Sequence, residues 1–171
     1  MKRFLNRYKR YGRTLWRLSA AQWGMLLGAA VMTGGVRLAL SWYSLREVVK
    51  GLQQMATRFP SRRPISPRYR REVAWIASRV GARLLPKRPC LTQALVTQFF
   101  LWRRGDDSTS MHIGVTKGDD GGLLAHAWVE HEGRVIIGGT GSPERYARLE
   151  QLEERIHAAP DEAGSPSKAA S

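Results

Sequence analysis

The apolar residues of this chain change their spacing near Gly105, and this change determines the class of fold that the chain can adopt. Before it, apolar positions recur every three to four residues, as they do on one face of an α-helix. After it, in STSMHIGVT at 108–116, apolar residues alternate with polar or small ones, as in a half-buried strand. LLAHAWVE at 123–130 and RVIIGG at 134–139 follow as two further strands, joined by a tight turn at 131–133. Helices followed by three antiparallel strands predict an α+β domain.

Serine and proline signals divide the helical half into segments. Ser19 is suited to cap a helix over 20–40, and a second helix is expected over 43–58. Three prolines in PSRRPISP at 60–67 interrupt the chain, and a third helix is expected over 68–84. The predicted apolar stripes are Leu45, Val48, Val49, Leu52 and Met55 or Ala56 on the second helix, and Val73, Ile76, Ala77, Val80 and Leu84 on the third.

The positive charge is concentrated in the first part of the chain. Residues 1–71 carry 16 Lys or Arg and a single acid, whereas residues 72–171 carry 12 basic and 13 acidic residues. An anionic partner is therefore expected for the first part and chemistry for the second. We divide the chain into a basic lead-in (1–18), a helical region (19–84), a core (85–141), a polar helix (142–157) and a disordered tail (158–171).

The stretch from Trp23 to Trp42 has the length of a bilayer span and a tryptophan at each end. Arg37 and several glycines within it argue against a spanning helix, because an arginine is costly inside hydrocarbon. We therefore expect a helix that is buried or lies in a membrane interface, and the spanning alternative stays open. No small-residue cleavage site follows this stretch, so a secretory signal is not expected.

The chain has one cysteine, Cys90, in RPCLTQAL at the expected start of a helix that runs to about Arg104. One cysteine excludes an internal disulfide and favours a reducing, cytoplasmic compartment. Taken alone, a single cysteine is more often a small core residue than a nucleophile. The interpretation therefore depends on whether a partner for the thiol exists.

The candidate partner is His126, in the strand at 123–130. Strand alternation places it on one face with Leu124, Trp128 and Glu130, and predicts the other face as core. That other face consists of Leu123, Ala125, Ala127 and Val129. The thiolate is the nucleophilic form of cysteine, and both a helix N-terminus and a nearby imidazolium favour it. A cysteine that starts a helix and a histidine on a following strand form the arrangement of papain-like thiol enzymes.

RPCLTQALVTQFFLWRRG and MHIGVTKGDDGGLLAHAWVEHEGRVIIGG resemble the transglutaminase-like cysteine peptidases of lasso-peptide maturation, which remove the leader from a ribosomally made precursor. The resemblance covers roughly residues 84–139. It implies a papain/transglutaminase-like core in which the nucleophile-bearing helix packs on a small antiparallel sheet. It also implies that Cys90 is the nucleophile and His126 the general base and acid.

The resemblance further implies partners. Family members with a fused leader-recognition domain carry a PqqD-like winged helix, and residues 1–84 show no strand pattern for one. We therefore expect a split system with a precursor peptide, a separate PqqD-like recognition protein and an asparagine-synthetase-like, ATP-dependent cyclase. The cyclase would close the macrolactam ring after leader removal.

The family's third catalytic residue is an Asp about a dozen positions after the histidine, and residues 137–140 contain no acid. Asp119 and Asp120 lie on the expected hairpin turn, and Glu130 stands about 13 Å along the strand. A backbone carbonyl or the Thr140 hydroxyl could orient the imidazole instead. The third member is left open.

Other residues support simpler interpretations. His112, His131 and His157 have no partners at metal-ligand spacing, so neither a metal nor a cofactor is expected. Aromatic residues interleave with the basic residues of 1–18, but no nucleic-acid module follows, which makes nucleic acid an unfavoured partner. Peripheral membrane contact of the basic half stays open. The alternative functions are another transglutaminase-like amide hydrolase or acyltransferase, and a non-enzymatic basic protein that binds a membrane or nucleic acid.

Overall fold

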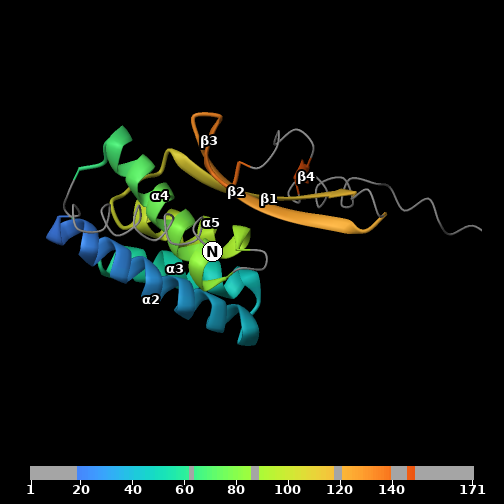
Figure 1. Cartoon of the computed structure of the whole chain (residues 1–171), viewed down its shortest axis with the longest axis horizontal. Helices are drawn as coiled ribbons and strands as arrows, with labels where there is room; N and C mark the ends of the chain where they lie inside the picture. Colours follow the sequence, from blue (N-terminus) through green and yellow to red (C-terminus); the bar gives the residue numbers. More distant parts are fainter. Residues whose placement is uncertain (1–18, 62–63, 86–88, 118–120, 140–145, 149–171) are drawn as a thin grey trace, which may run out of the picture.

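A computed structural model describes residues 19–61, 64–85, 89–117, 121–139 and 146–148. Within these residues, a layer of helices lies against one face of an antiparallel sheet (Figure 1). The helices are α2 (Ala20–Trp42), α3 (Leu45–Arg58), α4 (Pro67–Leu84) and α5 (Cys90–Trp102). The strands are β1 (Thr109–Lys117), β2 (Leu123–His131), β3 (Arg134–Ile137) and β4 (Ala147–Arg148), in the spatial order β3-β2-β1-β4. The predicted α+β class is confirmed.

Serine side chains cap three of the helices, including the predicted cap at Ser19. The Ser19 and Ser44 side chains each accept a hydrogen bond from the backbone N–H three residues on, and the side chains of Gln22 and Glu47 accept one from the backbone N–H of the cap residue. The Ser66 side chain caps α4 in a similar way, with proline in the first turn. Each cap satisfies N–H groups that a helix start leaves unpaired.

The predicted polar helix over 142–157 is wrong where the structure describes it. Ala147 and Arg148 form β4, which pairs with Val115 and Gly114 of β1. The rest of that segment, the basic lead-in and the predicted tail lie outside the described residues.

The core forms around α5, which contacts the other three helices and the sheet. Leu95, Val96 and Leu101 of α5 are completely buried there. The face of α3 that packs on this core carries Val48, Leu52 and Ala56. The last residue of the predicted stripe is therefore Ala56, because Met55 is exposed. On α4 the predicted stripe is buried as far as Val80, whereas Leu84 at the end of the helix is exposed.

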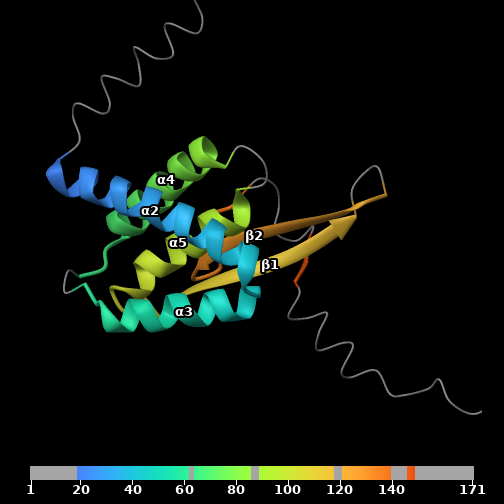
Figure 2. The same cartoon turned by 90° about the horizontal axis from the view of Figure 1, so that it is seen from below.

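The two faces of β2 differ from the prediction. Ala127 and Val129 pack into the helical core as expected, but Leu123 and Ala125 are exposed. The β1–β2 ribbon extends past the end of the helical layer, so none of the described helices covers the first residues of β2 (Figure 2). The opposite face is buried as well, at Trp128 and Glu130.

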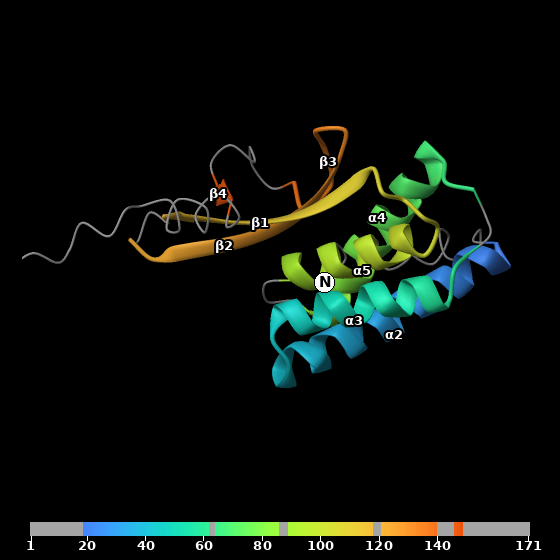
Figure 3. The ribbon, with the colours of Figure 1, turned by 180° about the vertical axis from the view of Figure 1, so that it is seen from behind.

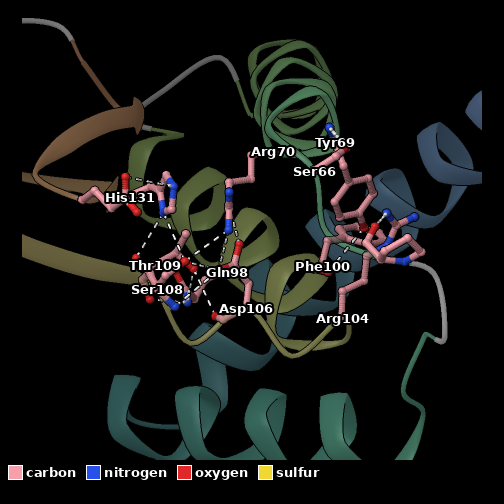
Figure 4. A network of polar contacts seen from close by, with 12 residues as sticks. Ser66, Tyr69, Arg70, Gln98, Phe100, Arg104, Asp106, Ser108, Thr109 and His131 are labelled. Carbon is pink, nitrogen blue, oxygen red and sulfur yellow. Dashed lines mark hydrogen bonds and ion pairs between the residues drawn. The ribbon is translucent and has the colours of Figure 1, made fainter.

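A polar network joins α4 to the chain that leads into the sheet (Figure 4). Arg70 donates to both carboxylate oxygens of Asp106, at 2.7 and 3.1 Å, and the Ser108 hydroxyl donates to the same carboxylate at 2.6 Å. Burial opposes ionisation of Asp106, but the hydrogen bonds from Arg70 and Ser108 outweigh it and lower the pKa of this carboxyl. The Ser108 hydroxyl also lies 3.2 Å from Nδ1 of His131, at the end of β2. The network therefore holds the segment before β1, and with it the end of β2, against α4.

Candidate active site

Cys90 is the first residue of α5, and its side chain is partly exposed. No described side chain caps this helix, in contrast to α2, α3 and α4. Pro89 occupies the N-cap position with helical backbone angles. The backbone N–H groups of the first turn therefore have no capping side chain, and the positive end of the helix dipole lies at the cysteine.

His126 lies in β2 opposite Gly114 of β1. Its Nε2 is hydrogen-bonded to the carbonyl oxygen of Gly138, twelve residues later in the chain. A carbonyl only accepts, so Nε2 carries the hydrogen in this contact and Nδ1 is the basic nitrogen. A backbone carbonyl thus holds the imidazole at the position where the resemblance expects an aspartate.

Gly138 can make this contact because it is glycine. Its φ is +87°, a conformation that side chains rarely adopt. A Cβ there would stand 2.5 Å from the Ala127 carbonyl oxygen and 2.8 Å from the Trp128 Cα. The chain after β3 therefore passes directly over the backbone of β2, which brings the Gly138 carbonyl to His126.

Two aromatic rings enclose the imidazole. The Trp128 ring is stacked with it, with centroids 6.2 Å apart and an interplanar angle of 16°. The Tyr146 ring lies 5.2 Å away, tilted by 33°. Gly114 makes room for this arrangement, since a Cβ on it would stand 2.7 Å from the Tyr146 Cβ and 3.0 Å from the Trp128 ring.

Trp128 is held in turn by a buried carboxylate. Its Nε1 donates to Glu130 at 2.7 Å, and Arg148 of β4 donates to both oxygens of that carboxylate at 3.1 Å. Nε2 of His112 lies 3.5 Å from the same carboxylate. Glu130 thus fixes Trp128 and links it to β4, and it has no hydrogen bond to His126 within the described residues.

The sequence did not identify Tyr146 and Arg148 as neighbours of this site, because it predicted a helix there. No signal within residues 142–157 alone could have identified them, since their position depends on the pairing of β4 with β1. Asp119, Asp120, Thr140 and His157 lie outside the described residues.

The structure places the two predicted site residues on neighbouring elements, Cys90 at the start of α5 and His126 in β2. α5 packs on the face of β2 that carries Ala127 and Val129, whereas His126 lies on the face that carries Trp128. Within the described part of the chain, no hydrogen bond joins the Cys90 thiol to the imidazole. The arrangement consists of a thiol at the start of α5 and an anchored imidazole on β2, two elements that pack against each other.

A sequence model of the Transglutaminase-like superfamily matches residues 30–152, from within α2 to beyond β4. The match covers most of the chain and includes both Cys90 and His126. The chain therefore belongs to the transglutaminase-like superfamily. This membership supports amide hydrolysis or acyl transfer of the cysteine-peptidase type. No curated protein and no solved structure matched the chain.

Proposed function

We propose that the chain is a cysteine peptidase that removes the leader from a lasso-peptide precursor. The observation that carries the proposal is the partly exposed Cys90 thiol at the uncapped start of α5, inside the superfamily match. The residues around it and around His126 resemble the leader peptidases of lasso-peptide maturation. The proposal places the enzyme in the cytoplasm, where the thiol stays reduced.

In the proposed reaction, Cys90 Sγ passes its proton to His126 and attacks the carbonyl carbon at the end of the leader. The backbone N–H groups at the start of α5 donate hydrogen bonds to the oxyanion. The C–N bond breaks, and His126 gives a proton to the leaving amine, which is the new N-terminus of the core peptide. Water then hydrolyses the thioester and releases the leader.

This chemistry requires the imidazole to reach the thiol, so the proposal includes a movement of the β1–β2 ribbon relative to α5. β3 pairs with β2 only from Val129 onward, so His126 lies where β2 has a single neighbouring strand. Leu123 and Ala125 of the same segment are exposed and not packed on the helices. A bound precursor would have to turn this end of the ribbon so that the His126 side chain reaches Cys90, and catalytic contacts often form only with substrate present.

The first test measures the alkylation rate of the single thiol with iodoacetamide between pH 5 and 9, with precursor peptide present. A thiol paired with His126 reacts well below pH 8, and His126→Ala slows that reaction by about tenfold or more. The matched control is His131→Ala, on the same strand but bound to Ser108. Equal rates in the wild type, His126→Ala and His131→Ala would refute the pairing.

The second test concerns leader removal itself. Cys90→Ala should fold normally and release no leader from a precursor peptide, because alanine has no nucleophilic atom. The assay would include a PqqD-like recognition protein and an asparagine-synthetase-like cyclase, the partners that the proposal requires. Leader release by the alanine variant would refute the thiol mechanism. A rapidly alkylated thiol without leader release would favour a different amide substrate.

A further inference from the structure

The helix α2 presents two contrasting faces, one packed and one open. Ala29, Thr33 and Val36 are buried in the helical layer, and the Gly28 backbone lies against Phe100 of α5. The open side, which we call the outer face of α2, consists of Trp23, Leu27, Val31, Leu38 and Trp42, whose exposed fractions run from 45 to 79%.

The outer face is a continuous apolar strip with interfacial residues at its ends. It extends over about 28 Å at the usual helical rise. α2 contains no acidic residue, and its single charged residue is Arg37, which is exposed. Tryptophan at both ends is typical of segments that lie at membrane–water interfaces. Figures 1 and 3 place α2 on the side of the helical layer that faces away from the sheet.

In the sequence, basic residues flank this strip on both sides. Residues 1–18, which lead directly into α2, carry seven Lys or Arg and no acid. Just beyond Trp42, Arg46 and Lys50 of α3 are exposed. A large apolar strip between cationic ends complements a bilayer surface that contains anionic phospholipid, where each basic residue adds to the attraction.

The packing of α2 determines how it can meet a bilayer. By length and composition, Gln22–Trp42 could cross a membrane. However, Thr33 and Val36 are almost completely buried against the other helices, and Gln22 donates a hydrogen bond to Glu72 of α4 at 2.6 Å. A spanning orientation would remove these contacts and expose the core around α5, whereas a flat orientation keeps them.

We propose that the outer face of α2 docks on an anionic phospholipid bilayer, with the helix axis in the plane of the membrane. This inference does not depend on the reaction proposed for Cys90. It predicts that the protein is a peripheral membrane protein, held by apolar insertion along α2 and by basic residues at both ends.

The test is flotation of the full-length protein with lipid vesicles. Vesicles of phosphatidylcholine with roughly one-third phosphatidylglycerol should carry the protein, and high salt or alkaline carbonate should release it. The double variant L27E/L38E should bind about a hundredfold more weakly, because it removes two inserted leucines and adds two negative charges. Both positions are well exposed, so folding should be unchanged.

The matched control is L123E/L124E, which makes the same change at two exposed leucines of β2, a strand of the sheet on the other side of the helical layer from α2 (Figure 1). The control should bind vesicles like the wild type. The proposal is overturned if both double variants bind equally, if the wild type does not float, or if the protein resists carbonate as a spanning protein does. Sedimentation that shows a dimer lost in L27E/L38E, without vesicle binding, would assign the outer face to a second copy of the chain.

Discussion

Among the described glycines, Gly138 is the one at which an added methyl group should lower the free energy of unfolding most. Gly138→Ala would place its Cβ 2.5 Å from the Ala127 carbonyl oxygen and 2.8 Å from the Trp128 Cα. Both are backbone atoms of a central strand and cannot rotate away. A φ of +87° adds about 1–2 kcal/mol for any residue with a side chain, and the overlap adds about 1–3 kcal/mol. We expect a loss of roughly 2–5 kcal/mol in the free energy of unfolding.

Thermal unfolding followed by circular dichroism measures this loss. For a chain of this length each kcal/mol lowers Tm by about 2–4 °C, so Gly138→Ala should melt roughly 4–20 °C below the wild type. Gly139→Ala is the matched control, because the nearest atom to its Cβ is Val135 Cγ1 at an ordinary 3.5 Å. The control should change the stability by less than about 0.5 kcal/mol.

The same pair of variants tests the contact with His126. If the Gly138 carbonyl orients the imidazole, Gly138→Ala should alter the NMR signals of the His126 ring, and Gly139→Ala should not. Equal Tm values for the two variants would refute the close approach of Gly138 to β2. Unchanged ring signals in a destabilised Gly138→Ala would refute the orienting contact alone. Gly138→Asp should be destabilised as well, so a carboxylate cannot be installed at this place without strain.

Two buried carboxylates give the remaining predictions. Asp106→Asn should cost about 2–4 kcal/mol in urea unfolding at pH 6, because it weakens the paired hydrogen bonds of Arg70. The folded-state pKa of Asp106 is lowered, so its contribution is complete above about pH 4 and is lost as the pH falls through the folded pKa. The variant should therefore lose less stability than the wild type between pH 6 and pH 3, and parallel curves would contradict this. Glu130→Gln should lower the stability by about 1–2 kcal/mol, whereas the exposed Glu132→Gln should have almost no effect, as compared by thermal unfolding.

Local signals explain how much of the fold could be predicted. Serine caps and helical apolar stripes act over a few residues, so the sequence identified the helices to within a few positions. β4 depends instead on Gly114 and Val115, some thirty residues earlier, and its own residues favour a helix. The exposure of Leu123 and Ala125 has the same kind of cause, since alternation shows which residues share a face but not where the covering helices end.

The candidate site shows the same difference between features that the local sequence determines and features that depend on distant residues. Sequence reasoning identifies residue types, so a lone cysteine at a helix start and a histidine on a strand could be selected for their chemistry. The partner of His126 is a backbone carbonyl, which every residue possesses, and its only trace in the sequence is the glycine that permits the approach. A neutral carbonyl can orient the ring but adds no negative charge beside an imidazolium. In the proposed Cys90–His126 pair, the thiolate–imidazolium state should therefore be less stabilised than in an enzyme with an aspartate at this place. The contacts made when the precursor binds would have to supply the stabilisation that the aspartate provides elsewhere.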